Sequence, residues 1–186
     1  MQSGEISPSQ AIDRPRRVFL GGYLILVFIS GLVLFLDQWT KNWVRGNLAY
    51  GERWMPWASL EPYVRILHWR NSGAAFGLFQ EGGGIFTILA IVVALLIVYY
   101  FPRIERGDWA LRLAMGLQLG GAIGNLIDRL QHGYVTDFIS VGNFPVFNIA
   151  DSSITLGVVI LLLDLWFGGH EDSNRGPTSK EQATGE

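Results

Sequence analysis

The sequence predicts a membrane α-helical protein, a bundle of four transmembrane helices with a small β-containing lobe outside the membrane. Of the 186 residues, 49% are hydrophobic and only 16% are charged, and the mean hydropathy is +0.28. A soluble domain carries nearer a quarter charged residues. The charged residues of this chain cluster at its two ends and in a few loops. They leave four stretches that are long and apolar enough to span a bilayer.

Composition also excludes several kinds of site and partner. The net charge of −2, without a basic stripe, gives no reason to expect a nucleic acid as partner. The chain has no cysteine, which excludes disulfides, zinc–thiolate sites and a cysteine nucleophile. The three histidines lie far apart in the sequence and form no metal-binding pair at helical spacing. We therefore expect no metal site.

The first predicted span covers residues 18–36, nineteen residues without a charge. Residues 1–17 are polar and lack apolar periodicity, so we expect a disordered segment there. A cleavable signal peptide is an alternative for this span, but its apolar core would be shorter and would end in small residues. A retained helix is therefore favoured. Asp37 and Lys41 follow it four residues apart and could pair. Their spacing alone favours an interfacial belt, in which Lys41 extends to the membrane surface beside Trp39 and Trp43.

Residues 42–83 form a long connection that is rich in aromatic residues. Residues 63–70 alternate well enough to predict a strand. Residues 71–77 predict a turn with a second short strand or a bend. The density of Trp and Tyr, together with Pro56 and Pro62, predicts a small β-containing lobe at the membrane surface. A solvated loop is the alternative, and the aromatic density argues against it.

Three further spans are predicted over residues 84–101, 109–127 and 150–167, and residues 168–186 form a polar tail. The span over 109–127 contains Arg112, Gln118 and Asn125. It also carries three glycines at four-residue intervals, Gly116, Gly120 and Gly124. Small residues let helices approach closely in lipid. This polar helix is therefore predicted to be buried among the others.

The distribution of lysine and arginine favours a cytoplasmic location for both ends of the chain. With the N-terminus inside, eight basic residues face the cytoplasm and six face outward. Arg14, Arg16 and Arg17, just before the first span, decide the orientation. This orientation places several polar residues together on the outer side, namely Asp37, Asn71, Asp128, Asp137 and Asp151.

Asp137 and Asp151 are the candidate catalytic residues. Asp137 lies between apolar neighbours, and Asp151 lies at the predicted start of the last helix. A helix N-terminus stabilises an ionised Asp151, while apolar surroundings oppose the ionisation of both carboxyl groups. Two carboxylates brought close together share one proton. One could then take a proton from water while the other protonates a substrate carbonyl, as in an aspartic peptidase.

Each aspartate also has a purely structural explanation, Asp151 as a helix N-cap and Asp137 as a turn residue. For either residue taken alone, this explanation is favoured. Asp128 is a weaker catalytic candidate because Arg129 follows it directly. Asn125, Asp128 and Arg129 share one helix face and could position a backbone or a lipid headgroup. Asp164 is expected at the cytoplasmic interface, without a role in the site.

Five motifs together resemble the lipoprotein signal peptidase family, also called signal peptidase II. They are residues 37–41 (DQWTK), 71–77 (NSGAAFG), 120–129 (GGAIGNLIDR), 133–138 (GYVTDF) and 147–151 (FNIAD). They occur in the order typical of the family and cover essentially residues 18–167. Together they are highly specific, whereas the motif around Asp37 alone would be weak.

The resemblance implies a four-helix enzyme of the bacterial inner membrane that acts at the periplasmic face. Its substrates would be prolipoproteins carrying diacylglycerol, cut just before the lipidated lipobox cysteine so that the signal peptide is released. Asp137 and Asp151 would be the catalytic pair. The remaining site residues fall into two groups, Asn71, Asn125, Arg129 and Asn148 lining the substrate site and Asp37, Lys41 and Asp128 holding the fold around it.

The resemblance further implies no metal or organic cofactor and inhibition by the cyclic peptide globomycin. We expect direct attack by water, without an acyl-enzyme, and a monomer in contact with membrane lipids. The peptidase domain would cover residues 18–167, with the lobe at about residues 42–83, between cytoplasmic segments 1–17 and 168–186.

Three other classes of function remain as alternatives. A proton-coupled transporter would place carboxylates near the membrane midplane and would commonly show inverted repeats, which we do not find. In a membrane scaffold, the polar residues would only fasten the helices together. A presenilin-type peptidase would carry both aspartates on mid-membrane helices, whereas Asp137 is predicted in a connection.

Overall fold

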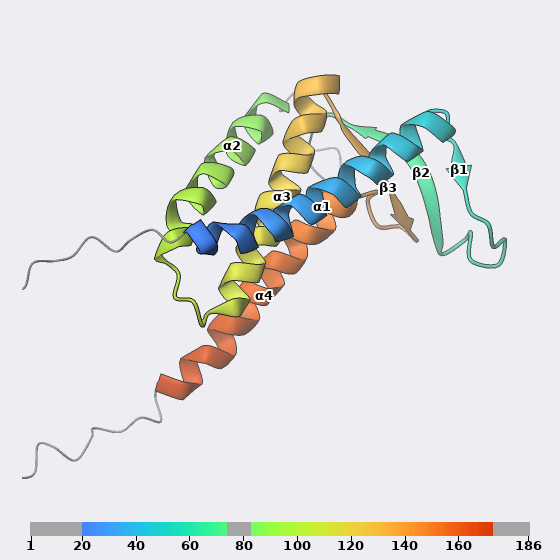
Figure 1. Cartoon of the computed structure of the whole chain (residues 1–186). Helices are drawn as coiled ribbons and strands as arrows, with labels where there is room; N and C mark the ends of the chain where they lie inside the picture. Colours follow the sequence, from blue (N-terminus) through green and yellow to red (C-terminus); the bar gives the residue numbers. More distant parts are fainter. Residues whose placement is uncertain (1–19, 74–82, 173–186) are drawn as a thin grey trace, which may run out of the picture.

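The computed structural model describes residues 20–73 and 83–172. Within these ranges, four long helices form a bundle, and a three-stranded sheet lies at the end of the bundle where α1 ends and α4 begins (Figure 1). The helices are α1 (Leu20–Asn47), α2 (Gly83–Tyr100), α3 (Trp109–His132) and α4 (Ile149–Asp172), and a short 3₁₀ turn, η2 (Phe101–Arg103), follows α2. All four helices are long and apolar enough to cross a membrane. The chain is thus a multi-pass membrane protein, as its sequence predicts.

Three of the helices continue beyond the ends predicted from hydropathy. α1 runs to Asn47, so the lobe begins after that residue and not at residue 42. α3 runs to His132 and ends at Gly133, whose φ of 77° and N–H bond to the carbonyl of Arg129 form a left-handed cap. α4 runs to Asp172, into the predicted polar tail. Hydropathy marks only the part of a helix that prefers lipid. A helix can continue beyond that part through polar residues. Residues 1–17 and 173–186 lie outside the described residues.

α3 is the central helix of the bundle, as predicted from its polar residues and glycines. Half of its most apolar window (50%) is buried, against 22% or less for the other three helices. The glycines explain the close packing, because a Cβ on Gly120 would lie 2.7 Å from the backbone oxygen of Ser30 on α1. A Cβ on Gly121 would lie 2.5 Å from the backbone oxygen of Ala150 on α4. Gly121 extends the predicted set of contact glycines.

The sheet has the order β1-β2-β3, with antiparallel neighbours. Its strands are β1 (Arg53–Trp54), β2 (Val64–Asn71) and β3 (Val135–Val141). β2 confirms the strand predicted over residues 63–70. β3 was predicted only as a connection between two spans. The side chains of residues 135–138 are all buried, so the strand lacks the apolar–polar alternation by which strands are recognised.

A small apolar cluster joins the sheet to the bundle. Val44 and Leu48 at the end of α1 pack with Phe138 of β3, and Ile66 of β2 and Ile149 of α4 pack against them. The strand that carries Asp137 is therefore held against α1 and the start of α4. This packing sets the position of the polar residues described next.

Candidate active site

Asp137 lies on β3 opposite Trp69 of β2 and is only 1% exposed. Its Oδ2 accepts a hydrogen bond from Nδ2 of Asn71 at 2.9 Å, and its Oδ1 accepts one from Nδ2 of Asn148 at 2.7 Å. Burial, followed by the nearby charge of Asp151, raises the pKa of Asp137 to about 7. The two amide donors partly oppose this rise. The carboxyl group of Asp137 can therefore hold or release a proton at neutral pH.

Asp151 lies in the first turn of α4, and its side chain and that of Asn148 cap the helix reciprocally. The Oδ1 of Asn148 accepts the N–H of Asp151 at 2.9 Å, while the Oδ2 of Asp151 accepts the N–H of Asn148 at 3.3 Å. This is a capping box built from an asparagine and an aspartate. Asn148 is thus the N-cap, and the structural explanation that gave this role to Asp151 is wrong. The explanation of Asp137 as a turn residue is also wrong, because Asp137 lies within a strand.

Two asparagine side chains connect the two carboxylates. Asn125 of α3 donates from Nδ2 to the Oδ1 of Asp151 at 2.8 Å. Asn148 donates from its own Nδ2 to the Oδ1 of Asn125 at 3.2 Å as well as to Asp137. A continuous polar path therefore runs from Asp137 through Asn148 and Asn125 to Asp151. Because amides stay neutral, the path orients the carboxylates without neutralising them.

A buried ion-pair network supports this path from the side of α1. The Nζ of Lys41 lies 2.8 Å from Oδ2 of Asp37 and 3.5 Å from Oδ2 of Asp128, and it donates to Oδ1 of Asn125 at 2.9 Å. The side chains of Lys41, Asp37 and Asp128 are all 0% exposed. The interfacial belt with a snorkelling Lys41, which spacing alone favoured, is therefore wrong. Asp37 also accepts the N–H of Ala150 at 3.0 Å, which fastens α1 to the first turn of α4.

Arg45 and Thr136 belong to the same network, and sequence reasoning missed both. Arg45 donates from Nη1 to Oδ1 of Asp128 at 3.1 Å and to Oγ1 of Thr136 at 2.8 Å. Oδ2 of Asp128 accepts the backbone N–H of Thr136 at 2.8 Å. Both the backbone and the side chain of the residue before Asp137 are thus held. Arg45 follows Lys41 by four residues, about one helical turn, which would place both side chains on the same face of α1. This relation was not considered because the first span was predicted to end at Leu36.

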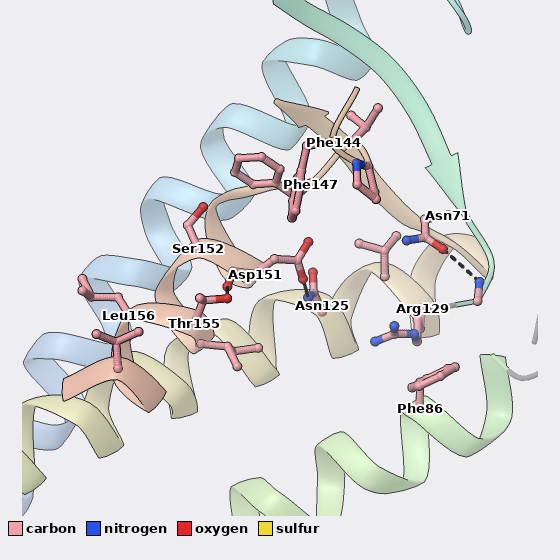
Figure 2. A pocket seen from close by; sticks show the side chains of 16 residues that line it. Asn71, Phe86, Asn125, Arg129, Phe144, Phe147, Asp151, Ser152, Thr155 and Leu156 are labelled. Carbon is pink, nitrogen blue, oxygen red and sulfur yellow. Dashed lines mark hydrogen bonds between the residues drawn. The ribbon is translucent and has the colours of Figure 1, made fainter. Parts of the chain in front are cut away.

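A cavity of about 700 Å³ opens beside these residues. Asn71, Asn125, Arg129 and Asp151 line its polar part, and Figure 2 shows Asp151 and Asn125 pointing toward one another there. The rest of the lining is mainly apolar and includes Phe144 and Phe147 from the β3–α4 connection and Leu156 and Val159 from α4. Asp137 is not among the lining residues, but its carboxylate accepts a hydrogen bond from Asn71, which is one of them. The cavity thus offers polar groups at one end and an apolar wall along α4.

Arg129 places a positive charge at the edge of this cavity. Its Cζ lies 5.7 Å from the ring centroid of Phe86 on α2, and Figure 2 shows the two side chains facing each other. Its guanidinium attracts the carboxylates of Asp151 and Asp137. Its buried Nε has no hydrogen-bond partner among the residues that the structure describes. Asp128, by contrast, forms its ion pairs with Lys41 and Arg45 rather than with its neighbour Arg129.

The structure brings together all nine site residues proposed from the sequence at one end of the bundle. They are Asp37, Lys41, Asn71, Asn125, Asp128, Arg129, Asp137, Asn148 and Asp151. Asp164 is exposed on α4, far along the helix from Asp151. Residues 74–77, the second half of the predicted turn, lie outside the described residues.

Comparison with known proteins agrees with this arrangement. The family described as "Signal peptidase (SPase) II" matches residues 29–167. A lipoprotein signal peptidase of Shewanella loihica is 38% identical over 170 residues, covering 87% of this chain and 91% of the relative. A lipoprotein signal peptidase of Acinetobacter baumannii is 43% identical over 155 residues, covering 77% of this chain and 84% of the relative.

A solved structure described as a bacterial membrane enzyme superposes with a TM-score of 0.73 at 30% identity, covering 87% of this chain and 95% of that one. A second solved bacterial membrane enzyme gives a TM-score of 0.69 at 32% identity. The family match covers the sheet, α2 and α3 completely and most of α1 and α4. The chain belongs to the signal peptidase II family.

Proposed function

We propose that this membrane peptidase is an aspartic endopeptidase that removes the signal peptide from diacylglyceryl-modified prolipoproteins, cutting just before the lipidated cysteine. The observation that carries the proposal is the pair of carboxylates Asp137 and Asp151, which are joined through Asn148 and Asn125, with Asp151 at the polar end of an apolar cavity. The pKa of about 7 for Asp137 supports a pair that shares one proton at neutral pH.

In the proposed reaction, one carboxyl group is protonated and the other is ionised. The ionised carboxylate takes a proton from a water molecule, whose oxygen bonds to the scissile carbonyl carbon. The protonated group gives its proton to the carbonyl oxygen, which yields a neutral tetrahedral intermediate. The C–N bond then breaks as the nitrogen takes a proton from one carboxyl group of the dyad and a hydroxyl of the intermediate returns its proton to the other. The products are the amine of the lipidated cysteine and the carboxylic acid of the signal peptide, and the dyad again holds one proton. The raised pKa of Asp137 favours this residue as the carrier of the shared proton.

The cavity supports a lipid-bearing substrate. Its apolar wall along α4 continues from Asp151 past Leu156 to Val159, so hydrocarbon can remain in the membrane while the peptide bond reaches the carboxylates. Arg129 and Asn71 at the polar end can bind the backbone carbonyls on either side of that bond. A cyclic peptide such as globomycin would compete for the same polar end. No acyl-enzyme is required, because neither carboxylate has to act as a nucleophile.

The proposed setting is the bacterial inner membrane, with both ends of the chain in the cytoplasm and the sheet at the periplasmic face. The basic residues before the first span support this orientation. Exposed aromatic side chains of the lobe, such as Trp57 and Tyr63, suit contact with lipid headgroups. The proposed active unit is a monomer.

The test is cleavage of a diacylglyceryl-modified lipobox peptide by the purified protein. Asp137→Asn and Asp151→Asn should each abolish turnover, while Asp164→Asn, the same change at an exposed position of α4, should leave it intact. Thermal unfolding of each variant separates loss of catalysis from loss of fold. Turnover retained by either site variant, or a trapped covalent peptide–enzyme adduct, would overturn the mechanism.

A further inference from the structure

A second cavity, of about 240 Å³, lies between α2 and α3. Phe86, Asn125, Arg129 and Ile154 line this cavity as well as the main one. Two grooves therefore continue from the polar end where Asp151 lies, one along α4 and one between α2 and α3. We call the second one the side groove. Its α2 wall is apolar, with Leu89, Ala90 and Val93 below Phe86.

Gln118 is the polar residue of the side groove that lies furthest along α3 from Arg129. Its Nε2 is buried and has no hydrogen-bond partner within residues 20–73 and 83–172. The side chain lies over Gly157 of α4, where a Cβ would approach its Cγ to 2.8 Å. The protein thus makes room for this amide without satisfying it. An unsatisfied amide donor inside a membrane bundle is costly and indicates a partner that is supplied from outside.

The depth of Gln118 restricts what that partner can be. Gln118 precedes Asn125 by seven residues and Arg129 by eleven on the same helix, which corresponds to about 10 to 16 Å along the axis. An acyl chain of the substrate would carry only methylene groups at that distance from its ester. A signal peptide, by contrast, carries a backbone carbonyl at every residue and hydroxyls at serine and threonine. Only the peptide offers an acceptor at this depth.

We propose that the side groove binds the apolar segment of the signal peptide, and that Gln118 donates a hydrogen bond to it seven to eleven residues before the lipidated cysteine. The acceptor is a serine or threonine hydroxyl or a backbone carbonyl. The signal peptide lies parallel to α3, since both run from the cytoplasm to the periplasmic face. The wall along α4 is thereby left to the acyl chains. This inference rests on the proposed function and assigns Gln118 a role in specificity rather than in catalysis.

The first test compares two lipidated substrates, one with the complete signal peptide and a serine in the predicted window, and one cut off six residues before the cysteine. Gln118→Met keeps the length of the side chain and removes the donor. It should lower kcat/KM on the long substrate by about three- to fifteen-fold, the range expected for one hydrogen bond between membrane helices, and should not change it on the short one. Gln131→Leu, at an exposed position of α3, is the control.

Equal losses on both substrates, or a loss that varies with acyl-chain length, would overturn the inference while leaving the proposed function in place. Failure of the wild-type protein to cut either substrate would instead overturn the proposed function, and this inference with it. The two failures are therefore distinguishable.

A crosslinking experiment provides a second measurement that does not depend on activity. The chain has no cysteine, so Val93→Cys introduces a single thiol into the wall of the side groove. In an Asp137→Asn background, which is expected to bind without cutting, this thiol should form a disulfide with cysteines placed seven to eleven residues before the lipidated one. Crosslinks confined to positions outside that window would contradict the proposed path.

Discussion

Asp137→Asn should inactivate the enzyme and at the same time stabilise it at alkaline pH. The pKa of Asp137 is raised to about 7 from 3.8, chiefly because the carboxyl group is buried. Between these two pH values the folded protein binds a proton that the unfolded chain has released. The free energy of unfolding of the wild type therefore falls as the pH rises from about 4 to 7, and levels off above that range. The difference between the two pKa values corresponds to a loss of about 4 kcal/mol in the free energy of unfolding over this pH range.

An asparagine at position 137 does not ionise and lacks this pH-dependent loss. It also loses one hydrogen bond, because the Nδ2 groups of Asn71 and Asn148 both need an acceptor and an amide has only one oxygen. That loss costs about 1 kcal/mol at every pH. The variant should accordingly be less stable than the wild type by about 1 kcal/mol at pH 4 and more stable by about 3 kcal/mol at pH 8.

The assay is thermal unfolding in detergent across this pH range, run beside peptide cleavage. Asp164→Asn should follow the wild type at every pH, because Asp164 is exposed. Stability curves of wild type and Asp137→Asn that run parallel from pH 4 to 8 would refute the assignment of a raised pKa to this carboxyl group. A variant that is less stable throughout would favour a purely structural role.

Three further predictions follow from the same contacts. Wild-type kcat/KM should fall above about pH 7, where Asp137 loses the proton that the mechanism requires; a rate that is constant from pH 6 to 9 would contradict this. Arg45→Gln should lower the free energy of unfolding by about 1–3 kcal/mol and reduce kcat more than it changes KM, because Thr136 and Asp128 lose their common donor. Arg53→Gln, in the exposed strand β1, is the control, and an equal effect of both changes would contradict the role of Arg45. Gly121→Ala should lower the free energy of unfolding by about 1–3 kcal/mol, because the new methyl group pushes α3 away from the backbone of Ala150. Gly31→Ala is the control, since its new methyl group has open space around it and should be tolerated. Unfolding curves of the two variants test this, and equal stability losses would contradict it.

The helices were predictable because hydropathy is a property of consecutive residues. The number of spans, their order and the central place of α3 all agree with the sequence. The end of α1 was not predictable in this way. Lys41 and Arg45 look like residues that leave the membrane, yet their charges are paired with aspartates on the same helix and on α3. Hydropathy assigns a cost to each charge singly and cannot see that its partner lies about 80 residues away, as the 83-residue separation of Arg45 and Asp128 illustrates.

The site, like the helices, was predictable in part. Asp137 and Asp151 were singled out from their apolar surroundings, although the spacing of each favoured a structural role. Most of the remaining polar residues were noted from their spacing and position, and the family motifs assigned them a role in the site. The strand that carries Asp137 was missed because burial on both faces removed its alternation.

By itself the sequence determined the class of the protein and its four spans, and it proposed the two carboxylates, because these depend on local composition and on short motifs. Only the tertiary structure decided which groups surround them. Asn148 both caps α4 and binds Asp137, and Arg45 holds the strand that carries Asp137. The Nε2 of Gln118 has no hydrogen-bond partner in the part of the chain that the structure describes. The physical reason is that burial and hydrogen-bond pairing depend on distances between elements that are remote in sequence, and packing alone sets those distances.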